Sequence, residues 1–233
     1  MNGAALLHLL QFASPALPIG GYSYSQGLEA ALEAGIVTDA ASARAWIVGH
    51  LHEVVAQWDA PLLWRLLQAH AAGDDAALAQ WSERALAARD TAELRAESVQ
   101  MGYSLARLLD ELGLAPTQAL AHTGAPASAA APEGDVALTV AYARAVAALA
   151  IPHDEALLAM LFGWAENQVL VCVKSVPLGQ VAGQRMLLSL RPELEAAALH
   201  ARGVGDDDMT NWSPGLSILS MRHETQHGRL YRS

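Results

Sequence analysis

Five residues near the carboxyl end of the chain, His223-Glu224-Thr225-Gln226-His227, match the pattern H-E-x-x-H. Two histidines four residues apart on a helix can share a zinc ion, with the glutamate between them as general base. Such a catalytic site needs a third protein ligand, and none of the six residues after His227 is His, Asp, Glu or Cys. We therefore favour a chance match to a short pattern and keep a zinc-dependent hydrolase as an alternative.

The segment that contains this pattern, residues 206–233, has the composition of a docking tail. It follows two glycines and three aspartates and predicts one short helix that begins at Pro214. Tyrosine, tryptophan and arginine dominate binding hot spots, and this segment is rich in them. A terminal helix packed on its own domain explains the composition equally well. The candidate partner-binding residues of the tail are Trp212, Arg222, Glu224, Arg229, Tyr231 and Arg232.

A second group of polar residues lies in an otherwise apolar predicted helix. Lys174 is the one lysine among 14 basic residues and lies two positions from the single cysteine, Cys172. The cluster Glu166-Asn167-Gln168 precedes it in the same helix. Buried polar groups need hydrogen-bond partners, either within the fold or on another protein. Composition alone favours coincidence for Lys174, whereas the polar cluster favours a function.

Other chemistry finds little support in the sequence. There is no G-x-x-x-x-G-K-[ST], G-x-G-x-x-G or G-x-S-x-G pattern. The net charge of -10 and the lack of a basic run argue against a nucleic-acid partner. No stretch of about 18 uninterrupted apolar residues predicts a membrane span, and no basic residue precedes the apolar run at residues 4–10. We therefore expect a cytoplasmic protein.

The elements that must position these residues are predicted to be helices. Alanine and leucine dominate, β-branched residues are few, and no pair of strands stands out. We expect an all-α, single-domain bundle of about eight to ten helices, with a core over residues 1–205 and the docking tail over 206–233. Only 16% of the residues are charged, which favours a surface partly covered in a dimer or a complex.

Apolar periodicity and capping residues place the individual helices. Helices are expected over 3–12, 24–34, 39–57, from there to 72, and then over 75–88, 91–112, 136–150 and 154–176. Residues 122–135, rich in Ala, Pro, Gly and Ser, predict a mobile linker. Gly179 and Gly183 are expected in one helix that approaches a neighbour closely.

Three separated stretches together resemble the urease accessory protein UreF family. The first comprises LPIGGYSYSQGLE at residues 17–29. The second comprises residues 89–109 and, further on, 161–188, with LFGWAENQVLVCVKSVPLGQVAGQRMLL. The third is the tail SMRHETQHGRLYRS. Three long motifs in this order cover most of the chain and are very specific.

The resemblance implies an all-α homodimer with no catalytic activity and no cofactor. It implies a complex with UreD, also called UreH, and the GTPase UreG that delivers nickel to apo-urease, with the chain recruiting UreG and regulating its GTP cycle. It also implies that the tail becomes ordered on UreD/UreH. The residues that it assigns to the GTPase side or a dimer surface are Lys174, Glu166, Asn167, Gln168, Tyr22, Tyr24, Gln26 and Glu29.

One position departs from the family pattern. Where the family often has an aromatic residue after His-Glu-Thr-Gln, this chain has His227. The departure leaves open whether His223 and His227 touch nickel, because imidazole suits that metal. A histidine-based nickel carrier is therefore a further alternative.

Overall fold

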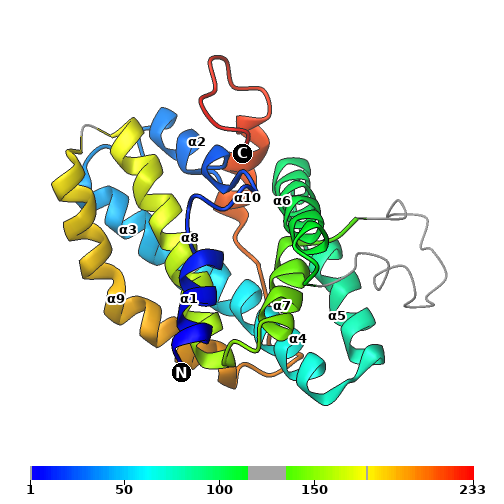
Figure 1. Cartoon of the computed structure of the whole chain (residues 1–233). Helices are drawn as coiled ribbons and strands as arrows, with labels where there is room; N and C mark the ends of the chain where they lie inside the picture. The colour runs from blue at the N-terminus through cyan, green and yellow to red at the C-terminus, as the bar shows by residue number, and fades with distance from the viewer. Residues whose placement is uncertain (1, 115–134, 177) are drawn as a thin grey trace.

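The computed structural model describes residues 2–114, 135–176 and 178–233, and these residues form an all-α fold without a strand (Figure 1). This confirms the predicted fold class. The helices in chain order are α1 (Gly3–Phe12), η1 (Gly21–Ser23), α2 (Leu28–Glu33), α3 (Ala40–His50), η2 (Leu51–Asp59), α4 (Ala60–Ala72), α5 (Asp75–Ala87), α6 (Ala92–Glu111), α7 (Leu138–Ala148), α8 (His153–Ser175), α9 (Gln180–Gly203) and α10 (Pro214–His223).

Helix α4 forms the centre of the bundle. It packs against α5, α7, α8 and α9, so its apolar side chains are enclosed on several sides. Leu62, Leu63, Leu66 and Leu67 have no exposed surface at all. A helix that is apolar around most of its circumference is expected in the interior of a bundle, and the apolar side chains of α4 anchor the core.

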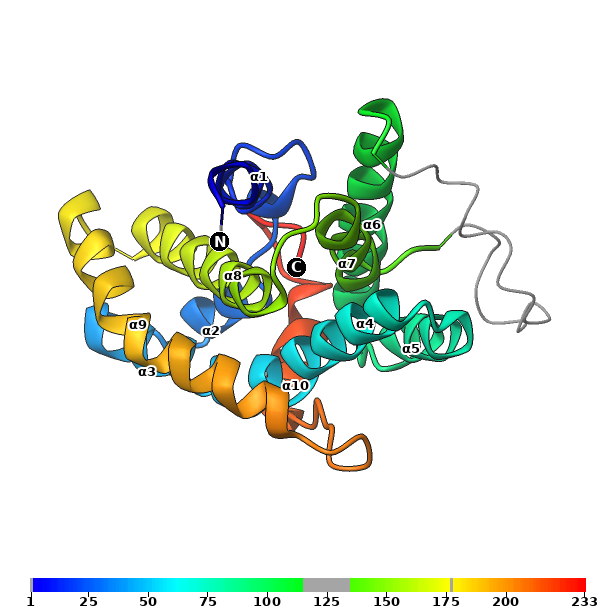
Figure 2. The same ribbon diagram turned by 60° about the horizontal axis from the view of Figure 1, so that its bottom comes forward.

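Residues 40–72 form one continuous helical rod, so the predicted break near residue 57 is wrong. The rod crosses the molecule from α3, beside α9, to the side where α5 packs (Figure 2). Asp39 and Ser42 form a capping box at its start. In its middle, η2 is a π-helix, and the α-helical register resumes at Ala60, next to Pro61. Proline has no N–H to donate and is tolerated in the first turn of a helix, so the rod continues through it.

The segment before α2 is not helical, which corrects the predicted helix over 24–34. Gln26 and Gly27 have φ angles of 53° and 80°, in the left-handed region that helices avoid. The helix therefore begins at Leu28. The Tyr24 carbonyl and the Ser25 N–H are therefore not part of a helix. They bind Asn167 and Ser233 instead.

The sequence predicted that a helix with Gly179 and Gly183 approaches a neighbour closely. Helix α9 does approach α8 closely, at Gly183. A Cβ on Gly183 would lie 2.5 Å from Val173 Cγ2, so only glycine fits there without a shift of Val173. Gly179 lies before α9 and has open space around it. Asp154, expected as the cap of α8, lies in its first turn and pairs with Arg202 at 2.5 Å.

The predicted linker over 122–135 lies outside the described residues except for Asp135, which pairs with Arg95 at 3.0 Å.

By length and composition alone, α8 could cross a membrane. Because α9, α4 and α2 pack against it, it is equally the core helix of a bundle, and its composition is weak evidence for a membrane.

Candidate functional site

The tail, residues 206–233, docks on its own chain, with α10 packed between α2 and α6 (Figure 1). Leu216 and Leu219 of α10 are buried there. The hydroxyls of Ser220 and Thr91 lie 2.7 Å apart. Beyond α10 the chain turns back, and the Arg232 N–H donates to the Ser23 carbonyl at 2.8 Å. The tail therefore contacts the body with both its helix and its last residues.

Glu29 of α2 holds the turn of the tail. The backbone N–H groups of Leu230 and Tyr231 donate to its carboxylate at 2.7 and 2.9 Å. The Nε2 atom of His223 lies 2.9 Å from the same carboxylate. Glu29 is almost fully buried, and buried charges need such partners. A residue predicted for a partner surface is therefore enclosed in this state and binds the tail instead.

His223 is enclosed between two carboxylates. Its side chain has no exposed surface, and its Nδ1 atom lies 2.8 Å from Glu93 Oε2. Arg229 donates to the other oxygen of Glu93 at 2.7 Å. Glu93 belongs to α6, so the contacts of this histidine join the tail to two helices of the body.

This geometry does not fit the zinc signature. Helix α10 ends at His223, so the exposed His227 does not lie on the next turn of the same helix, and both ring nitrogens of His223 already contact carboxylates. Within residues 2–114, 135–176 and 178–233, no group of three or more His, Cys, Asp or Glu could hold a metal ion. The structure gives no support to a hydrolase or nickel carrier built on these two histidines.

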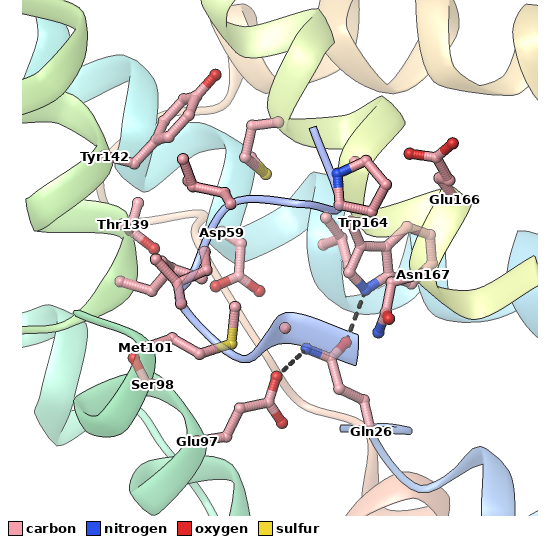
Figure 3. Close-up of a pocket in the computed structure, with 18 of the residues that line it drawn as sticks. Gln26, Asp59, Glu97, Ser98, Met101, Thr139, Tyr142, Trp164, Glu166 and Asn167 are labelled. Carbon is pink, nitrogen blue, oxygen red and sulfur yellow. Dashed lines mark hydrogen bonds between the residues drawn. The ribbon is translucent and has the colours of Figure 1, made fainter. Parts of the chain in front are cut away.

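The end of the tail connects to the interior through a chain of hydrogen bonds, of which Figure 3 shows the two made by Gln26. The Ser233 hydroxyl donates to Glu97 at 2.7 Å. Gln26 Nε2 donates to the other oxygen of Glu97 at 2.6 Å, and Trp164 Nε1 donates to Gln26 Oε1 at 2.7 Å. Burial raises the pKa of Glu97, against the effect of these donors. The left-handed turn at Gln26 thus places a polar side chain between α6 and α8.

A cavity of about 230 Å³ lies beside this chain of hydrogen bonds. Met101 and Tyr142 line it, and Figure 3 shows Met101 close to Asp59 and Glu97. Asp59 pairs with Arg89 at 2.5 Å. Burial lowers the pKa of His50, another residue of the wall, to about 4, so this imidazole is neutral near pH 7. The polar side of the cavity thus combines one ion pair with a buried carboxyl and a neutral imidazole.

On the outer surface, Lys174 lies between two tyrosines. Its Nζ atom is 6.0 Å from the centre of the Tyr22 ring and 5.9 Å from that of Tyr231, at the outer limit of cation–π contacts. Ser23, Leu230 and Arg232 complete the same shallow hollow. We call these six residues the lysine surface. Two of them come from the first motif, one from α8 and three from the tail.

The predicted site residues therefore fall into four groups. Tyr22, Lys174 and Arg232 are exposed on the lysine surface, where the ring of Tyr231 lies largely buried beneath them. Trp212, Arg222, Glu224 and Arg229 are exposed elsewhere on the tail. Half-buried on the cavity wall are Gln26, Glu166 and Asn167. Enclosed in the interior are Tyr24, Glu29 and Gln168.

One residue of the polar cluster in α8, Asn167, supports the fold through a hydrogen bond in this state. Asn167 Nδ2 donates to the Tyr24 carbonyl at 2.9 Å, which fixes the non-helical segment before α2. Gln168 is fully buried, and its amide has no hydrogen-bond partner within the described residues. Burial raises the pKa of Glu166.

Several residues of this site carry no distinctive signal in the sequence. Ser25, Glu93, Glu97 and Arg89 act here through contacts with residues far away in the chain. In the sequence, the last three read as ordinary surface charges, Glu93 and Glu97 on a predicted helix and Arg89 just before it. Membership of the second matched stretch, residues 89–109, is the one signal that could have drawn attention to them.

The chain was compared with known proteins. The sequence model of the UreF family matches residues 37–191. A urease accessory protein UreF from Janthinobacterium sp. is 60% identical over 233 residues, which is 100% of both chains. One from Nitrosospira multiformis is 52% identical over 231 residues, 98% of each. A bifunctional urease accessory protein UreEF from Bordetella bronchiseptica is 48% identical over 99% of this chain and 52% of its own length.

Proposed function

Because the chain belongs to the urease accessory protein UreF family, we propose that it is a non-enzymatic adaptor for urease maturation. It binds the UreD/UreH scaffold and the GTPase UreG, regulates the GTP cycle of UreG, and so serves nickel insertion into apo-urease. The names of its relatives support a role in urease maturation. The assignment of individual partners to surfaces follows from the resemblance and from the geometry of the tail.

The observation that carries the proposal is the composite lysine surface. Lys174 and Arg232 are exposed, and neither forms an ion pair within the described part of this chain of net charge -10. Tyr22, with 59% of its surface exposed, lies beside them. Arginine and tyrosine are typical of binding hot spots, and unpaired cations favour an acidic partner surface. We assign the lysine surface to UreG.

The outer face of the tail suits a different partner. Trp212 is 78% exposed, and Ile218 and Met221 of α10 are about half exposed. Large apolar side chains so close together on one segment are typical of an interface. We assign this face to the UreD/UreH scaffold. The two assignments allow one docked tail to contribute to both interfaces at once.

The proposal also covers the oligomeric state of the chain, its location and its lack of a nucleotide site. The exposed side chains of Leu6, Leu7 and Leu10 on α1 and the low share of charged residues favour a homodimer or a larger assembly. A cytoplasmic location follows from the proposed GTPase partner, which needs access to GTP. A regulator of the GTP cycle needs no nucleotide loop of its own, and the sequence contains none.

The assignment of the lysine surface is tested by binding of purified UreG to the complex of this chain with UreD/UreH. We expect Lys174→Ala and Arg232→Ala each to weaken UreG binding about tenfold or more, while UreD/UreH binding is unchanged. Arg107→Ala is the matched control, because this exposed arginine lies outside the lysine surface and pairs with Glu111 on its own helix. Unchanged UreG binding by both variants would contradict the assignment.

A further inference from the structure

Two backbone hydrogen bonds hold the end of the tail against the segment before α2. The Arg232 N–H donates to the Ser23 carbonyl, and the Ser25 N–H donates to the Ser233 carbonyl, both at 2.8 Å. Each segment donates one of these bonds and accepts the other. The main chain is therefore fixed on both sides of the Arg232 side chain.

Two serine hydroxyls add side-chain contacts at the same place. The Ser25 hydroxyl donates to the Ser233 carbonyl at 2.5 Å, and the Ser233 hydroxyl donates to the Glu97 carboxylate at 2.7 Å. A hydrogen bond to an ionised acceptor is stronger than one between neutral groups. Ser25, Ser233 and Glu97 are all buried, so they are enclosed by their own chain while the tail is docked.

The burial of residues 231–233 shows what these contacts achieve. Tyr231 and Ser233 are buried, whereas Arg232 between them is exposed. Alternating burial is the pattern of an extended segment, in which successive side chains point to opposite faces. The enclosure of Ser233 therefore turns Arg232 outward, where it lies on the lysine surface with Lys174.

A separate anchor holds the tail just before this point. Glu29 accepts the backbone N–H groups of Leu230 and Tyr231. Loss of the contacts of Ser233 should therefore loosen residues 232 and 233 and leave the preceding turn docked. The placement of Arg232 can thus be changed separately from the docking of the tail.

We propose that Ser25, Glu97 and Ser233 are positioning residues for UreG binding, which touch no partner and act by holding Arg232 in place. This role rests on the proposed assignment of the lysine surface to UreG. A side chain that is already held in its bound position loses less conformational entropy when a partner binds. These buried hydrogen bonds therefore raise the affinity for UreG from beneath the surface that it contacts.

The first test needs no partner and asks whether the hydroxyls hold Arg232. Amide exchange of the full chain, followed by NMR, reports on each N–H separately. In Ser233→Ala, which loses one hydrogen bond, we expect the protection of the Arg232 amide to fall about threefold to tenfold, whereas the Leu230 amide stays protected by Glu29. Ser25→Ala should lower the protection of the Arg232 amide similarly. Unchanged protection of this amide in both variants would overturn the proposal.

The second test is binding of purified UreG to the complex of this chain with UreD/UreH. We expect Ser233→Ala to weaken UreG binding about threefold to tenfold and to leave UreD/UreH binding unchanged. Because a positioning residue acts through Arg232, the double variant Ser233→Ala/Arg232→Ala should bind UreG no more weakly than Arg232→Ala alone. Ser104→Ala is the matched control, since this hydroxyl donates to the Gln100 carbonyl of its own helix.

The outcomes separate the positioning role from the proposed function. If Ser233→Ala binds UreG as tightly as the wild type, or if its effect adds in full to that of Arg232→Ala, the positioning role is wrong. If Arg232→Ala itself binds UreG normally, the assignment of the lysine surface to UreG is wrong, and the role in UreG binding is overturned with it. In that case a loss of Arg232 amide protection in Ser233→Ala would still show that the hydroxyl holds this residue.

Discussion

Different forces stabilise the core around α4 and the contact of the tail with α2 and α6. Around α4, leucines with no exposed surface pack on several helices, and apolar burial stabilises this region in proportion to area. Between the tail and these two helices, the decisive contacts are a few charged hydrogen bonds, with Glu29, Glu93 and Glu97 at their centre. The first arrangement rests on apolar area alone, whereas the second combines these polar contacts with the buried side chains of Leu216 and Leu219.

This difference suits the roles that we assign to the two regions. Segments that move in binding are drawn from the less stable parts of a protein. We expect that the tail, which three carboxylates hold, can dissociate from α2 and α6 without disturbing the core, because few of its side chains are buried in the core. The core can therefore remain a rigid support while the tail responds to partners.

The largest expected effect comes from removing apolar volume at the centre. Leu66→Ala creates a cavity in α4, where the side chain is fully buried, and should reduce the free energy of unfolding by about 2–5 kcal/mol. Chemical denaturation followed by circular dichroism measures it. A loss below about 1 kcal/mol would show that α4 is not the centre of the stable core.

A smaller effect is expected from Glu29→Ala, and it should be confined to the tail. This change leaves the N–H groups of Leu230 and Tyr231 without their acceptor, at about 1–3 kcal/mol for a hydrogen bond to a charged group. Trypsin should then cleave rapidly after Arg229, while the denaturation midpoint of the core stays near that of the wild type. Unfolding of the whole chain together with the tail would remove the distinction between the two regions.

The smallest effect on stability is expected from Trp212→Ala. This exposed side chain should contribute less than about 0.5 kcal/mol to folding. Its loss should nevertheless weaken binding to UreD/UreH about tenfold or more, if it is an anchor of that interface. Calorimetric titration with the scaffold protein measures it, and equal affinity for both proteins would remove Trp212 from the interface.

The sequence predicted the helical fold and many helix ends for local reasons. Asp39, Thr91 and Pro214 are found at the helix starts expected from their chemistry. The π-helix and the continuous rod were missed, because a shift of hydrogen-bond register leaves the apolar pattern largely intact. The non-helical turn at Gln26 was missed because glutamine rarely adopts a positive φ.

The site was predictable only in part, for reasons of distance along the chain. Glu29 and Tyr231 are 202 positions apart, and helical spacing cannot reveal such a contact. His223 matched a metal signature because the pattern assumes that the helix continues, whereas α10 ends at that residue. Lys174 and Tyr22 were named from the resemblance and Tyr231 from the composition of the tail, and the fold brings the three together.

The most direct test of the adaptor proposal is urease activation in cells that contain urease and the other accessory proteins. The comparison is between no chain, the full chain and a chain that stops after Val204, with folding of the shortened chain checked by circular dichroism. We predict activation by the full chain alone, because the tail supplies Tyr231 and Arg232 to the lysine surface. Full activation by the folded, shortened chain would contradict the account.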